Sequence, residues 1–219
     1  MSQQTTTQRY SPGEEIANSV THGVGLMLSI AGLAVLTAFA SLHGSIGHIV
    51  SCVIFGTTLI LLYTASTLYH GIQAPQAKSI MRVLDHSAIF LLIAGTYTPF
   101  TLVSMQGVWG WSLFGVVWGL AMIGILFQTT LLRRWFRASL FLYVAMGWAI
   151  LAAIKPLMAA VAPGGLILLL LGGLAYTSGI IFYVRRSMRY HHAIWHVFVL
   201  AGSTLHFFAV LFYVIPVAA

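Results

Sequence analysis

Residues 192–216, HAIWHVFVLAGSTLHFFAVLFYVIP, carry the two features that decide the fold. After the opening histidine the run is apolar over 193–216, and a helix needs about 20 such residues to cross a bilayer. His192 and His196 are four residues apart, so on a helix they lie about 40° apart around the axis and about 6 Å apart along it. Both imidazoles can therefore point at one metal ion. The spacing alone is short and common by chance, and it also suits histidines at the level of the lipid headgroups.

Six more apolar runs precede this one, each of about 20 residues. The seven predicted spans are 17–42, 46–69, 82–105, 109–131, 137–154, 164–184 and 193–216. Hydrophobic residues make up 59% and charged residues 6% of the 219, which excludes a water-soluble domain. The loops are short and no internal repeat is visible, so residues 1–219 are predicted to form a single domain. The predicted fold class is all-α: an integral membrane bundle of seven transmembrane helices.

The ten lysines and arginines predict how the bundle is oriented. Nine of them fall on one side of a seven-span chain and Lys155 alone falls on the other, so the positive-inside rule places the N-terminus in the cytoplasm and the C-terminus outside. The nine are Arg9, Lys78, Arg82, Arg133, Arg134, Arg137, Arg185, Arg186 and Arg189. The net charge of +7 is spread in small clusters between apolar runs, which indicates topology signals rather than nucleic-acid binding.

Polar residues that are unusual in membrane helices gather at the predicted cytoplasmic side. Six of them lie at ends of the first three spans: Glu15, Asn18, His22, Ser66, His70 and Asp85. The first three share one helix face at i, i+3 and i+7, and Ser66 and His70 share another at i and i+4. Ionisable groups inside a membrane are expensive, so this gathering indicates a functional site. For Asp85 the alternative is an ion pair with Arg82 on the preceding turn.

Three histidines from two spans, His70, His192 and His196, match what a catalytic zinc ion requires. Such a site has three neutral imidazoles and an open fourth position, at which zinc activates a water molecule near neutral pH. Zn²⁺ is favoured over copper or iron because no cysteine or methionine and no second carboxylate lies near these positions. Asp85 would then orient the water or accept its proton, and Ser66 would hydrogen-bond the water or a developing oxyanion. A site inside the membrane boundary predicts a lipid-like substrate.

The remaining conspicuous residues are interpreted as structural. His86 and His191 each neighbour a proposed site residue, but adjacent helical positions point about 100° apart, which favours contact with solvent or headgroups. His206 lies about 21 Å along the helix from His192, too far for the same metal, and is expected to hydrogen-bond within the bundle. Pro99, inside the third span, is expected to kink that span.

Three ordered motifs make the chain resemble a known family. They are Glu15-x-x-Asn18-x-x-x-His22, Ser66-x-x-x-His70 followed by Asp85, and His192-x-x-x-His196. The set resembles the signature motifs of the progestin and adiponectin receptor (PAQR) family, and the local wording is similar to its bacterial branch, the hemolysin III or TrhA-like inner-membrane proteins. The resemblance implies a cytoplasmic-side zinc held by His70, His192 and His196, with Ser66 and Asp85 near the metal-bound water. It makes Glu15, Asn18 and His22 candidates for supporting the ligands.

The same resemblance sets the expected location and activity. It implies the inner (plasma) membrane of a bacterial cell and membership of a broader group of membrane metal hydrolases, in which adiponectin receptors are associated with ceramidase activity. For the bacterial branch it suggests a part in membrane fluidity or fatty-acid homeostasis, beside an older haemolysin label. Hormone binding by the animal receptors is not carried over.

Three function classes follow. The first is a zinc-dependent intramembrane hydrolase of a lipid amide or ester. The second is a non-enzymatic sensor of membrane state in which zinc is structural. The third, a hemolysin-type cytolysin, is the weakest, because a pore is expected to carry polar residues through its full thickness and here they gather at one end. Membrane lipids are the expected partners, and no nucleic acid is expected.

Overall fold

Seven helical segments long and apolar enough to cross a membrane make up the part of the chain that the structure describes. The structure is a computed structural model that describes residues 10–129 and 136–216, without the side chains of 136 and 137. Its elements are α1 (Pro12–His43), α2 (Ile46–Gly71), α3 (Pro75–Pro99), η1 (Phe100–Met105), α4 (Gly107–Thr129), α5 (Phe136–Gly147), η3 (Ala149–Ala153), α6 (Ile154–Ala160), α7 (Pro163–Val184) and α8 (His191–Tyr213). The predicted all-α, seven-span fold class is confirmed.

Capping residues and prolines mark where several of the helices begin. Ser11 and Glu14 form a capping box before α1: the Glu14 N–H donates to Ser11 Oγ at 3.4 Å, and the Ser11 N–H donates to Glu14 Oε2 at 2.9 Å. Pro12, Pro75 and Pro163 begin α1, α3 and α7, at a position whose N–H would have no partner inside the helix. These signals fix where three of the membrane helices begin.

Two helix bounds differ from the predicted spans. The third span starts at Pro75 instead of 82, because its first turns are polar yet still helical. The fifth runs over Ala138–Ala160 instead of ending at 154. Lys155 and Pro156 suggested an end, but both lie in the first turn of α6, where a proline removes no intrahelical hydrogen bond, and the Lys155 side chain is exposed.

The fifth span is broken in the middle, and Tyr97 satisfies the broken backbone. α5 ends at Gly147 and continues through the tighter helix η3 into α6. The Tyr97 hydroxyl lies 2.9 Å from the Met146 carbonyl and 2.8 Å from the Gly147 carbonyl, and it accepts the Ile150 N–H at 3.0 Å. One side chain of α3 thereby supplies the hydrogen bonds that the break removes, which a membrane interior cannot supply.

A second irregularity follows Pro99 in the third span. The six residues after it form the wider helix η1 rather than an α-helix. Proline has no N–H to donate, and its ring pushes on the preceding turn, so a change of helix geometry at this point has a direct cause. The kink expected at Pro99 thus takes the form of a widened turn.

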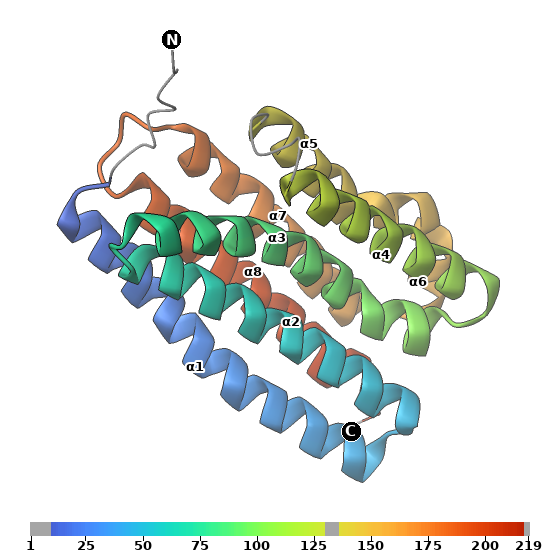
Figure 1. Cartoon of the computed structure of the whole chain (residues 1–219). Coiled ribbons are helices and arrows are strands. Elements are labelled where there is room, and N and C mark those ends of the chain that lie inside the picture. Colours follow the sequence, from blue (N-terminus) through green and yellow to red (C-terminus); the bar gives the residue numbers. More distant parts are fainter. Residues whose placement is uncertain (1–9, 130–135, 217–219) are drawn as a thin grey trace.

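The helices lie side by side in one bundle (Figure 1), with α1 and α2 on one side and α4, α5 and α6 on the other. The tightest pairs are α1 with α2, α2 with α3, and α7 with α8. Small residues permit these approaches: a Cβ atom at Gly95 of α3 would overlap the Thr58 side chain of α2. The ends of α1, α2 and α3 are thereby held beside the start of α8, where the candidate site lies.

Candidate metal centre

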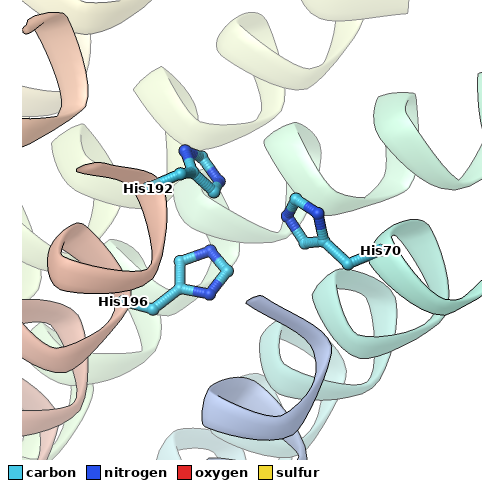
Figure 2. A group of neighbouring side chains, drawn as sticks. All are labelled: His70, His192 and His196. Atoms are coloured by element: carbon cyan, nitrogen blue, oxygen red, sulfur yellow. The ribbon is translucent and has the colours of Figure 1, made fainter. Parts of the chain in front are cut away.

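Three histidines meet between α2 and α8, and we call them the histidine cluster: His70, His192 and His196 (Figure 2). His70 comes from the last turn of α2, and the other two come from the first turns of α8. One ligand nitrogen from each lies within 4.8 Å of the others, and all three side chains are buried. The i, i+4 spacing on α8 does bring two imidazoles to one point, as the sequence predicted, and α2 delivers the third.

Residues of α1 hold two of these rings in position. Glu15 Oε2 lies 2.7 Å from His70 Nδ1, and a carboxylate can only accept, so Nδ1 carries the proton. The Asn18 amide nitrogen lies farther from the same atom, at 3.4 Å. The Nδ1–H of His196 donates to the Asn18 backbone carbonyl at 3.1 Å. In both rings the hydrogen bond at Nδ1 leaves the Nε2 lone pair available, which is the usual arrangement behind a metal-bound imidazole.

The cluster also contains buried nitrogens that the described residues leave without hydrogen bonds. These are His70 Nε2 and His192 Nδ1. Buried polar atoms are nearly always paired, because an unpaired one costs about 1–3 kcal/mol. A cation bound by the three rings would satisfy them. The donor set therefore fits a borderline-soft divalent metal such as zinc.

Asp85 and Ser66 lie beside the cluster in a cavity of about 150 Å³. Both line this cavity together with His192 and His196, and the Ser66 hydroxyl lies near the Asp85 carboxyl group. Among the described residues the nearest nitrogen partner of the Asp85 carboxyl group is His86 Nδ1, at a long 3.8 Å, rather than the Arg82 guanidinium. The ion pair weighed as an alternative role for Asp85 is therefore not the one observed. The carboxylate faces the cavity instead.

The rest of the cavity is mainly apolar. Its walls come from α2, α3, α5, α7 and α8 and include Leu62, Leu92, Val144, Ile180 and Val199. His206 lines it at a position far along α8 from the cluster. A hydrophobic pocket that has a few polar groups gathered at one place is typical of a site for a small apolar ligand.

His22 packs directly against the cluster. Its ring stacks on that of His196, with centroids 3.4 Å apart and planes 11° apart, and meets Tyr63 edge to face at 4.9 Å. Glu15 and Asn18 also contact the cluster, at His70 and at His196. The structure therefore brings the three predicted site residues of α1 to the histidine cluster. Asp85 and Ser66 join them on the cavity side.

Two interpretations from the sequence need correction. His191 is buried, not solvated, and its Nδ1–H donates to the Phe182 carbonyl at 3.0 Å, because the turn before α8 folds back over the end of α7. Buried polar groups also extend beyond the cluster: Tyr63 Oη lies 2.8 Å and Tyr176 Oη 2.7 Å from Ser203 Oγ. Chemistry-bearing residues are therefore not confined to one end of the bundle.

The expectation for His206 is met, whereas His86, which was expected to contact solvent or headgroups, lines the cavity beside Asp85. His206 donates to the Leu169 carbonyl at 3.1 Å, so it does hydrogen-bond within the bundle. His86 is partly buried, and its Nδ1–H donates to the Arg82 carbonyl at 2.7 Å, one turn earlier on its own helix. Neither belongs to the group of three that offers metal ligands.

Two residues at the site were not found from the sequence. The Tyr10 ring covers the cluster from the end of the bundle, with its centroid 5.2 Å from that of His192 and 5.8 Å from that of His70. Burial raises the pKa of the Tyr10 hydroxyl, so this cover stays neutral. Lys78 Nζ lies 2.8 Å from Glu15 Oε1. Neither contact follows a helical spacing, because each joins segments that are distant along the chain.

The arrangement of helices and motifs agrees with the comparison to known proteins. The profile of the Haemolysin-III related family matches residues 10–207, nearly the whole chain. The chain belongs to this family. Hemolysin-3 of Bacillus cereus is 46% identical over 206 residues, covering 94% of each chain. The Hemolysin-3 homolog of Bacillus subtilis is 49% identical over 204 residues, covering 93% of this chain and 96% of that one.

A more distant relative extends the match to animals. The human monocyte to macrophage differentiation factor is 26% identical over 212 residues, covering 92% of this chain and 86% of its own length. The resemblance to the bacterial hemolysin III branch, and through it to the wider receptor family, is thus confirmed. With seven apolar helices, the chain is a multi-pass membrane protein of the haemolysin-III related family.

Proposed function

We propose that this protein is a zinc-dependent hydrolase that cleaves an amide or ester bond of a membrane lipid and contributes to lipid or fluidity homeostasis in the bacterial inner membrane. The observation that supports this most is the histidine cluster at the wall of a largely apolar cavity that also holds Asp85 and Ser66. Metal ligands, a carboxylate, a hydroxyl and a space for an apolar chain meet at one place.

The residues divide the work as follows. His70, His192 and His196 would hold the zinc ion, which when bound supplies a Lewis acid for activating water. The apolar walls bind the lipid chain and exclude bulk water from the reacting bond. Asp85 accepts at Oδ the proton that the attacking water loses and returns it to the leaving group. The Ser66 hydroxyl donates a hydrogen bond to the oxygen on which charge develops.

The side of the membrane follows from the basic residues. Lys78, Arg82, Arg185, Arg186 and Arg189 flank the same helix ends that carry the cluster. Arg9, Arg133, Arg134 and Ala219 lie outside the described residues, as does the side chain of Arg137. The positive-inside rule puts this end in the cytoplasm, so the substrate would be drawn from the inner leaflet.

The direct test is to purify the protein and measure metal and turnover together. We expect about one zinc per chain. Nanodiscs containing N-acyl and O-acyl lipids should release fatty acid, detected by mass spectrometry, and release should stop after chelation and return with Zn²⁺. The His192→Ala, His196→Ala double variant is the matched blank. A chain that carries full zinc in this variant, or that releases no fatty acid from any lipid when zinc-loaded, contradicts the hydrolase.

A second candidate function, a membrane-state sensor with structural zinc, is favoured by one observation. The ligands come from α2 and α8, which are not among the closely packed helix pairs. A metal held by both helices would therefore brace a part of the bundle that has few backbone contacts. In that case the metal matters for folding and Asp85 does not matter for function.

A further inference from the structure

Lys78 forms an ion pair with a buried carboxylate, that of Glu15. It lies in the first turn of α3, and its Nζ atom has three oxygen partners. These are Glu15 Oε1 at 2.8 Å, the Tyr69 carbonyl at 2.9 Å and the Ile72 carbonyl at 3.3 Å. An ammonium group has three N–H donors, so all of them are used. Nζ also lies 5.0 Å from the centre of the Tyr69 ring.

These partners place the positive charge of Lys78 at the C-terminal end of α2. The Tyr69 carbonyl belongs to the last turn of α2 and the Ile72 carbonyl to its C-cap residue, at the end where a helix presents its partial negative charge. Lys78 therefore acts as a cationic cap on the helix that carries His70. The three contacts hold the Lys78 ammonium group in one position, so the side chain keeps a single rotamer.

Glu15 connects this cap to the histidine cluster. Its two oxygens face opposite partners: Oε1 faces Lys78 and Oε2 faces His70 Nδ1, at 2.8 and 2.7 Å. The carboxylate is buried, and a buried charge without a partner is costly. Without Lys78, the carboxylate would lose the contact that holds Oε1 and would be free to rotate away from His70.

We propose that Lys78 is a positioning residue of the metal centre, which acts through Glu15 to hold His70 in the orientation that binds the metal. The inference rests on the proposed metal site and extends it to a residue that the sequence marked only as a topology signal. The order of contact is Lys78, Glu15, His70, metal. Loss of either outer member should weaken metal binding without removing a ligand.

The test measures metal affinity in purified full-length protein by competition with a chelator of known affinity for Zn²⁺. Removing the direct hydrogen-bond partner of a metal-bound histidine, here Glu15, typically costs about 10- to 100-fold in affinity, and we expect a loss of about 10-fold for Lys78→Met, which acts through Glu15. Lys78→Arg keeps the charge and should recover most of it. Arg185→Met, which removes an exposed charge at the same end, is the matched control and should bind as the wild type does.

Two further measurements separate positioning from general loss of structure. In a double-mutant cycle, Lys78→Met should have little added effect in a Glu15→Gln background, because the pathway is already cut. The visible absorption of Co²⁺ bound in place of zinc should shift in Lys78→Met and return to the wild-type spectrum in Lys78→Arg, since it reports ligand geometry. Lys78→Gln, which keeps donors for the two carbonyls, serves if the methionine variant does not purify.

The outcomes distinguish this inference from the proposed function. Wild-type affinity and an unchanged Co²⁺ spectrum in Lys78→Met, or losses that simply add in the cycle, would overturn the role of Lys78 while leaving the metal centre standing. A wild-type protein that binds neither Zn²⁺ nor Co²⁺ overturns the metal centre itself, and the inference with it.

Discussion

Asp85 is the residue that separates a catalytic metal from a bracing one. It lines the cavity beside the cluster without belonging to the group of metal ligands. Asparagine has nearly the same shape but cannot take a proton. We therefore expect Asp85→Asn to keep its zinc and its melting temperature while the rate of lipid hydrolysis falls by about 10² to 10⁴.

The companion variant is His192→Ala, which removes a ligand. Zinc, melting temperature and activity should fall together, because binding energy for the metal is also folding energy. Zinc content, thermal unfolding and the lipid composition of cells would be compared at matched expression. A zinc-loaded Asp85→Asn protein that supports normal lipid composition would favour the sensor over the hydrolase.

Single residues also show where sequence reasoning stops. The pair His192 and His196 is predictable because a helix places i and i+4 side by side. Lys78, Tyr10 and His191 were missed or misread because their partners lie on other segments, and only the packing of helix ends brings them together. Local spacing can locate ligands, but their supports depend on tertiary structure.

Among the helices, the contact between α2 and α3 depends on a missing side chain. A Cβ atom at Gly95 would overlap Thr58, whereas one at Gly115 of α4 would meet no atom within 4 Å. Gly95→Ala should therefore destabilise the protein by about 1–3 kcal/mol through overpacking. Gly115→Ala is the control, and thermal unfolding in detergent should show it unchanged or slightly more stable. Equal melting temperatures for the two variants would contradict the close approach of α2 and α3.

The break in the fifth span makes a separate prediction. Tyr97→Phe keeps the ring but removes the hydroxyl that lies between the Gly147 carbonyl and the Ile150 N–H. Backbone groups left unpaired in a membrane-buried bundle cost about 1–3 kcal/mol, so we expect the free energy of unfolding to fall by that amount and the melting temperature to fall with it. Hydrogen exchange should also quicken at residues 147–150. Unchanged exchange at residues 147–150 would mean that the backbone at the break keeps its structure without the Tyr97 hydroxyl.

At this scale the sequence predicted the number of spans but not all their bounds. Hydropathy detects the apolar part of each helix, so the polar turns that begin α3 at Pro75 went unseen. Pro156 suggested a stop because proline usually ends a helix, and only the structure shows that a new helical segment starts just before it. Breaks and restarts depend on partners such as Tyr97, which no local pattern reveals.

For the whole molecule, the prediction concerns orientation. The native background suits thiol labelling, since Cys52 is buried. Exposed positions are available at both ends: Gln73 and Ser187 lie at the end that holds the histidine cluster, and Ala162 lies between α6 and α7. In intact spheroplasts a membrane-impermeant maleimide should label Ala162→Cys, whereas Gln73→Cys and Ser187→Cys should react only after the membrane is opened. The reverse pattern would place the cluster at the outer leaflet.

The Tyr10 ring over the histidines has a practical consequence for handling the protein. Nine residues separate the N-terminus from Tyr10, whose ring lies 5.2 Å from that of His192 and 5.8 Å from that of His70. A polyhistidine purification tag at that terminus would add imidazoles that bind Zn²⁺ themselves and would raise the measured metal content of the protein. Affinity tags should therefore use a peptide without metal-binding side chains before any zinc measurement is interpreted.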